Sequence, residues 1–131
     1  MSDNFSSHDF FNAWNKCLIP SLYDAFNPFD GTPLHNAFST LVNSEEWKQT
    51  LQAIDEALQA AGALITELLT FELNFLCSYD GTNDPGSPTP EHAKLEKIKI
   101  ILNSLNYVLD TLDFKHKKLL HILIELIGLA Q

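Results

Sequence analysis

The sequence contains no arginine, and eight lysines face 17 acidic residues, for a net charge of −9. Arginine is the residue that binds phosphates through two parallel hydrogen bonds and reads guanine most often. An acidic chain without arginine is poorly suited to the nucleic-acid backbone, which attracts basic surfaces. We therefore expect a protein that binds no nucleic acid and that meets basic rather than acidic partners.

Cysteine is scarce, and long apolar runs are missing. Cys17 and Cys77 belong to no Cys-x-x-Cys motif, so we expect two buried thiols in a reducing compartment, although their spacing is also compatible with a disulfide. The polar N-terminus has neither the basic nor the apolar part of a secretory signal. The most apolar stretch, 57–77, is interrupted by Glu67 and Glu72, which predicts that no helix spans a membrane. The expected location is the cytoplasm.

Signatures of catalysis are also lacking. The chain contains no Gly-x-Ser-x-Gly, no His-Glu-x-x-His, no phosphate-binding loop and no dinucleotide fingerprint. We therefore predict no enzymatic activity, no cofactor and no metal. The alternative is a helical metalloprotein or enzyme, because Asp113 and His116 have the three-residue spacing of carboxylate-bridged di-iron bundles, with Glu67 or Glu72 facing them. The simpler interpretation of His116 is a histidine of the core or of its edge.

Signals for β-strands are missing as well, and helical periodicity takes their place. Apolar residues recur at alternating steps of three and four, a 3.5-residue repeat that is typical of packed helices. In 43–78 the repeat follows a capping residue, Asn43 or Ser44, and consists of Trp47, Leu51, Ile54, Leu58, Ala61, Ile65 and Leu68. In 90–129 it follows a Thr89 cap and consists of Leu95, Ile98, Leu102, Leu105, Leu109, Leu112, His116, Leu119, Leu123 and Leu126.

These patterns predict one all-α domain, a helical bundle built on a long antiparallel hairpin. Its two helices would be 43–78 and 90–129, joined by the linker 79–89, with a kink near 110–113 left open. Residues 1–42 would form short helices packed across the hairpin: one over 7–19 that Pro20 interrupts, and one over 34–42 after a loop. The predicted core includes Leu58, Ile65, Leu102, Leu105 and Leu109.

Charge is distributed unevenly, which suggests a working surface. Residues 1–90 hold 12 acidic residues and two lysines, whereas 91–131 hold five and six, a difference that favours complementary charges between helices. We predict a non-enzymatic binder of the inhibitor, immunity, anti-defence or adaptor kind, which masks a basic or apolar surface on another protein. The apolar stretch 119–129 is either covered by the N-terminal segment or exposed as a homodimer contact or a binding surface. The predicted partner-binding residues are Glu45, Glu46, Asp55, Glu56, Phe10, Phe11, Phe26 and Phe29.

Overall fold

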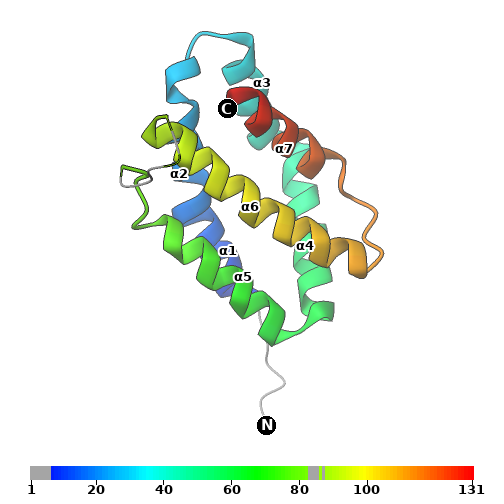
Figure 1. Cartoon of the computed structure of the whole chain (residues 1–131). Coiled ribbons are helices and arrows are strands. Elements are labelled where there is room, and N and C mark those ends of the chain that lie inside the picture. Colours follow the sequence, from blue (N-terminus) through cyan, green and yellow to red (C-terminus); the bar gives the residue numbers. More distant parts are fainter. Residues whose placement is uncertain (1–6, 83–85, 87) are drawn as a thin grey trace.

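The predicted all-α class is confirmed by the computed structural model, which describes residues 7–82, 86 and 88–131. Helix accounts for 81% of these described residues, and none of them lies in a strand. The helix α6, Pro90–Thr111, runs across the bundle between α5, Ala63–Leu76, and α7, Lys118–Ala130 (Figure 1). The N-terminal helices pack behind α5 and α6.

The N-terminal helices form a longer continuous run than predicted. The α-helix α1, His8–Ala13, passes through a π-helical turn, Trp14–Leu18, into α2, Ile19–Phe26. The prediction that Pro20 interrupts the helix is wrong. A proline ring clashes with the carbonyl four residues earlier, but that carbonyl belongs to Lys16, inside the wider π turn, where hydrogen bonds reach five residues back.

The chain then turns into a second predicted helix. A 3-10 turn, Asn27–Phe29, leads into α3, Pro33–Val42. The Thr32 hydroxyl accepts a hydrogen bond of 3.3 Å from the His35 amide and so caps the start of α3.

The predicted single helix over 43–78 is wrong, because the chain breaks at Gly62. The first part, α4, is Glu45–Ala61, capped by Ser44 as predicted, and α5 follows. Gly62 has φ 97° and ψ 170°, a conformation that is essentially restricted to glycine. The break changes which side of the chain faces the core. Ile65, predicted to be buried, is therefore 38% exposed, whereas Leu69 and Leu73 lie inside.

The predicted helix over 90–129 is interrupted as well. Thr89 caps α6 as predicted, with a 3.0 Å bond from the His92 amide, but α6 ends at Thr111. Asp113 adopts φ 58°, a left-handed conformation that aspartate tolerates better than most residues. The chain reverses over 112–117, so α7 folds back against α6.

The long hairpin is therefore replaced by four shorter helices. Of these, α5 and α6 lie side by side and run in opposite directions (Figure 1). Part of the predicted linker between them, residues 83–85 and 87, lies outside the described residues. Four of the predicted core residues are buried: Leu58, Leu102, Leu105 and Leu109.

The stretch 119–129 is largely covered, as one of the two alternatives predicted. Leu120, Leu123 and Ile127 are fully buried, and α3 from the N-terminal segment packs against α7. Leu129 remains 72% exposed at the end of the helix.

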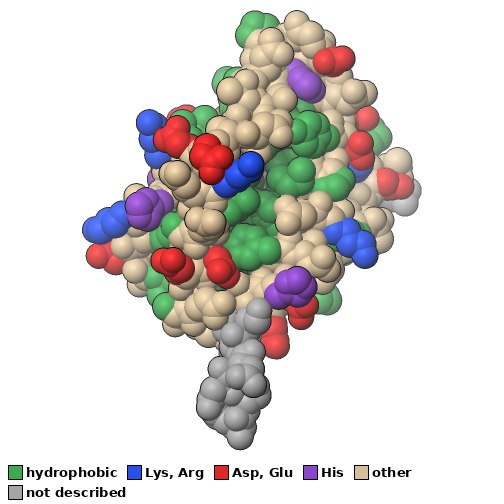
Figure 2. All heavy atoms as spheres, turned by 180° about the vertical axis from the view of Figure 1, so that it is seen from behind, with side chains coloured by type: hydrophobic (Ala, Val, Ile, Leu, Met, Phe, Trp, Pro, Cys, Tyr) green, Lys and Arg blue, Asp and Glu red, His purple; other side chains and the backbone are tan. Residues whose placement is uncertain are grey.

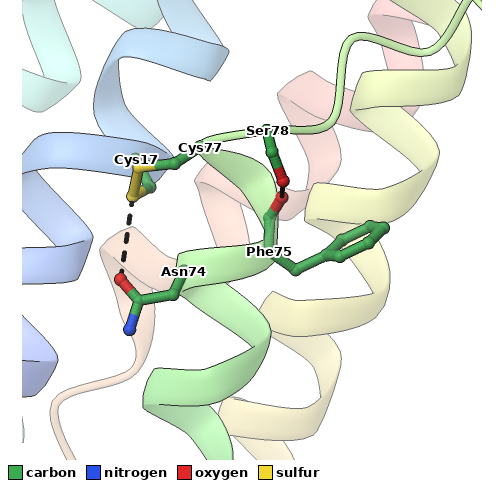
Figure 3. The surroundings of a disulfide bond; sticks show 5 residues. All are labelled: Cys17, Asn74, Phe75, Cys77 and Ser78. Atoms are coloured by element: carbon green, nitrogen blue, oxygen red, sulfur yellow. Dashed lines mark hydrogen bonds between the residues drawn. A yellow bond between two sulfur atoms is a disulfide. The ribbon is translucent and has the colours of Figure 1, made fainter.

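The expectation of two free thiols is wrong, because Cys17 and Cys77 form a disulfide (Figure 3). Their Cα atoms lie 4.7 Å apart, so the bond ties the π-helical turn to the residue that follows α5. Cys17 is buried, whereas Cys77 is exposed. Sequence spacing alone could not predict this bond. The two cysteines are separated by 60 positions in the sequence, and only the packing of α5 on the N-terminal run brings them together.

Candidate functional site

The predicted acidic surface on α4 is not free of positive charge. Glu46 and Glu56 line a polar cleft of about 430 Å³ whose other wall contains Lys115, His116 and Lys118. The reversal at 112–117 brings these groups there, so the chain's own lysines lie across the cleft from the α4 carboxylates. This arrangement makes the cleft a weaker site for a basic partner than its acidic residues alone indicate.

The remaining α4 acids have local roles. Glu45 is exposed in the first turn of α4, where a carboxylate complements the helix dipole. Asp55 accepts a hydrogen bond from the Ser7 hydroxyl at the start of α1. Asp55 and Phe11 also line one shallow pocket, so the structure brings these two predicted site residues together.

The predicted aromatic anchors are mostly core residues. Phe10 is 2% exposed and packs on Trp14, while Phe26 is fully buried and stacks on Phe38 with ring centres 4.4 Å apart. Their expected exposure is therefore wrong, because the helical run His8–Phe26 turns both rings inward. Phe11 and Phe29 are half-buried against the core. Hydrophobic side chains do gather along the middle of the face shown in Figure 2, among acidic, basic and polar groups.

The alternative metal site is not assembled. Asp113 and His116 lie in the irregular connection between α6 and α7, so the helical spacing that would align them is lost. Asp113 is exposed and bonds Lys115 at 3.1 Å. His116 is also exposed, which makes its predicted place in or beside the core wrong. Among the described residues, no group of three or more His, Cys, Asp or Glu side chains is arranged to hold a metal ion.

A different surface, on α5 and α6, carries most of the exposed apolar side chains. Nine large hydrophobic side chains of the described residues are exposed, and seven of them belong to these two helices. Four of the seven line one groove, and exposed apolar side chains gathered in this way mark sites of interaction. We call this surface the α5–α6 face; it consists of Leu64, Ile65, Leu68, Phe71, Phe75, Ile100 and Tyr107.

The α5–α6 face contains a groove of about 610 Å³ between the two helices. Its walls are mainly apolar, with three polar side chains among them, from Glu72, Asn103 and Ser104. We call this the α5–α6 groove; its lining residues are Ile65, Leu68, Leu69, Glu72, Ile100, Asn103, Ser104, Tyr107 and Val108.

One end of the face is capped by a lysine. The Lys97 ammonium lies 5.4 Å from the centre of the Phe75 ring and 5.7 Å from that of Tyr79. Figure 3 shows Phe75 extending from α5 toward α6, on the side of the helix away from Cys17. The contact fixes this end of α5 against α6 by cation–π attraction.

Glu72 is the charged group of the groove. Its side chain is half-buried on α5, and within the described residues it forms no ion pair or hydrogen bond. Glu67, one turn and a half earlier on the same helix, is exposed and does not line the groove.

Two carboxylates elsewhere have shifted pKa values. A hydrogen bond of 2.6 Å from Gln131, aided by the nearby Lys99 ammonium, holds the pKa of Glu96 below its usual value. The Thr82 amide and hydroxyl lower the pKa of Asp80 in the loop after α5. Both groups remain ionised at neutral pH and stabilise local structure rather than the groove.

Comparisons with protein-family models, curated proteins and solved structures gave no significant match. Within the described residues, no helix combines the length and hydrophobicity that crossing a membrane requires. The function must therefore be argued from the surface of the chain itself.

Sequence reasoning missed the α5–α6 face because it assigned the apolar residues of 63–76 to the core. A signal was present: α5 has apolar residues on almost every side, more than the neighbouring helices α1, α4 and α6 cover. The stretch 119–129 is similarly apolar, but α3 and α6 pack against α7 and cover most of its apolar side chains.

Proposed function

We propose that this protein is a non-enzymatic binding protein that holds a partner protein on the α5–α6 face. The observation that carries the proposal is the gathering there of seven of the nine exposed large hydrophobic side chains in the described residues. Apolar side chains around a groove provide the anchors of a protein interface, and polar groups at the rim orient the partner. The net charge of −9 favours encounter with a basic partner.

The proposal can be tested without knowing the partner. The chain would serve as bait for a display library of random 16-residue peptides, and the selected peptides would be titrated against Leu68→Asp and Leu129→Asp. Leu68 lines the groove and is 61% exposed, while Leu129 lies on α7 and is 72% exposed, so both substitutions place a charge at an open site.

We expect the selected peptides to bind wild type and Leu129→Asp alike, and to bind Leu68→Asp at least about tenfold more weakly, as loss of an interface anchor predicts. Equal binding by all three proteins would contradict a role for the α5–α6 face. Circular dichroism and thermal melting would verify that both variants fold.

We further propose that the protein works in an oxidising compartment rather than in the cytoplasm. The disulfide between Cys17 and Cys77 supports this location, because such bonds persist outside reducing compartments and are rare in the cytosol. Alkylation of free thiols in protein taken directly from its native cells would test it. Labelling of both cysteines before reduction would favour the cytoplasm instead.

A further inference from the structure

We infer that the occupant of the α5–α6 groove is an amphipathic helix of a partner protein that places a lysine or arginine against Glu72. The inference rests on the proposed function and goes further, because it names the shape of the occupant and the charge that it must carry.

The shape of the groove suits a helix. Two helices that lie side by side leave a furrow along their length, and a third helix fills such a furrow through side chains spaced three and four residues apart. The groove extends along α6 from Ile100 to Val108, a length of about 12 Å at 1.5 Å per residue. This length accommodates about two turns of an occupant, with apolar anchors against Ile65, Leu68 and Ile100.

The charge of the groove selects the occupant further. Glu72 lies among apolar side chains and has no charged partner within the described residues. An apolar occupant would remove water from this carboxylate and leave it unpaired, which is costly. A lysine or arginine on the occupant would replace the lost water with a charge-assisted hydrogen bond.

The lysine of the same face does not neutralise Glu72. Lys97 is held over the Phe75 and Tyr79 rings at the end of the face and forms no ion pair with Glu72. The other lysines of α6 pair elsewhere: Lys94 lies 3.4 Å from Asp24, and Lys99 lies 3.5 Å from Glu96.

A second copy of the chain fits this charge less well. Two copies facing each other through the groove would bring their Glu72 carboxylates together, and each copy has a net charge of −9. Like charges brought together across an interface cost several kcal/mol. Charge complementarity therefore favours a basic helix from a different protein.

The test is a selection of binding helices, and its readout is the charge of the residue that is enriched at one position of the helix. The bait would be the full chain, and the probe a display library of 18-residue amphipathic helices with leucine anchors and one randomised position beside them. Parallel selections would use Glu72→Lys, the matched control Glu67→Lys and the groove variant Leu68→Asp. Glu67 suits the control because it is an exposed carboxylate of the same helix that does not line the groove.

We expect wild type and Glu67→Lys to enrich lysine and arginine at the randomised position, and Glu72→Lys to enrich aspartate and glutamate. A selected helix should bind Glu72→Gln about fivefold more weakly than wild type, as loss of a partly buried ion pair predicts. The same helix with its basic residue changed to glutamine should bind wild type and Glu72→Gln with equal affinity.

The remaining outcomes separate this inference from the proposed function. Helices that depend on Leu68 but show no preference for charge would overturn the inference and leave the binding face standing. Binding that is indifferent to both Leu68→Asp and Glu72→Lys would overturn both. A wild-type chain that dimerises in sedimentation, and that Leu68→Asp makes monomeric, would identify a second copy as the occupant and overturn the basic helix.

Discussion

The Lys97 ammonium on α6 lies 5.4 Å from the centre of the Phe75 ring on α5, so a cation joins the two walls of the α5–α6 groove at one end. The neighbouring ring of Tyr79 stacks on Phe75 with ring centres 5.4 Å apart and extends the platform. This contact lies about one helical turn beyond Glu72 and Ile100, which line the groove.

Substitution of Lys97 by glutamine should lower the free energy of unfolding by about 0.5–1 kcal/mol, the value of a partly exposed cation–π contact. Lys48→Gln is the matched control, because Lys48 is an exposed lysine of α4 that makes no cation–π contact or ion pair within the described residues. Urea denaturation would measure both. Equal loss of stability in the two variants would show that only charge matters.

Reduction of the disulfide should destabilise the chain strongly. The bond between Cys17 and Cys77 closes a loop with a sequence separation of 60, and loop-closure entropy predicts a loss of about 4 kcal/mol when it opens. Denaturation with and without a thiol reductant would measure this loss. Cys77→Ala should resemble the reduced protein, because Cys77 is exposed and its replacement removes little packing. Identical transitions with and without reductant would contradict a structural role.

Two glycine substitutions should act in opposite directions. Gly62→Ala should lower the free energy of unfolding by about 1–3 kcal/mol, because φ 97° is strained for a residue with a Cβ atom. Gly128→Ala should raise it by about 0.5–1 kcal/mol, since Gly128 lies within α7 and a Cβ atom there meets nothing within 4 Å. Thermal melting would show the two shifts. Stabilisation by Gly62→Ala would mean that α4 and α5 straighten into one helix.

Truncation to alanine should have different effects at two residues that the 3.5-residue repeat predicts to be buried. Leu105→Ala should cost about 2–5 kcal/mol, because Leu105 is 1% exposed at the centre of α6. Ile65→Ala should cost far less, since Ile65 is 38% exposed on the α5–α6 face. Chemical denaturation of both variants would measure the difference. Comparable losses of stability would indicate that Ile65 is buried, as an uninterrupted helix over 43–78 predicts.

The contact between Glu96 and Gln131 should appear in a pH titration. The pKa of Glu96 lies below its ordinary value of 4.5, first because Gln131 donates to it and then because Lys99 is near. The carboxylate form is the one that is bonded, so this stabilisation is present above pH 4.5 and is lost as the pH falls through the lowered pKa. Gln131→Ala should raise the pKa of Glu96, as carboxyl NMR shifts would record, and should leave that of Asp80 unchanged.

The sequence predicted the helical class, the capping residues and much of the core because these depend on short-range patterns. Ser44 and Thr89 cap helices as expected, since a hydroxyl before a helical segment needs only the next three residues to act. Leu102, Leu105 and Leu109 are buried because three successive turns of α6 present them on one side.

The break at Gly62 could not be predicted, because the 3.5-residue repeat passes through it without a slip, whereas the break after Thr111 falls at the kink near 110–113 that the sequence left open. Gly62 is tolerated within a helix as well as at its end, and only the tertiary structure decides which. Asp113 is similar, since aspartate is accepted in helices and in left-handed turns. Periodicity reports the spacing of apolar residues, and it does not report a change in the direction of the chain.

The candidate site escaped prediction for a related reason. Glu45, Glu46 and Glu56 are exposed on α4 and Asp55 is half-buried, but the lysines across the cleft arrive through the reversal at 112–117. The apolar surplus of α5 was assigned to the core, because no neighbouring helix can be counted before the fold is known. The pattern of apolar residues in one helix does not show which other helices pack against it, so it cannot predict a surface formed by two helices.

The disulfide divides the molecule into a closed ring and an open tail. The ring runs from Cys17 to Cys77 and includes α5, whereas α6 belongs to the tail that leaves the ring after Cys77. One wall of the α5–α6 groove is thus anchored covalently to the N-terminal run, and the other is held only by packing and by contacts such as that of Lys97. Widening of the groove is therefore a movement of the tail against the ring, and the packing of α6 on α2 and of α7 on α3 determines how easily it occurs.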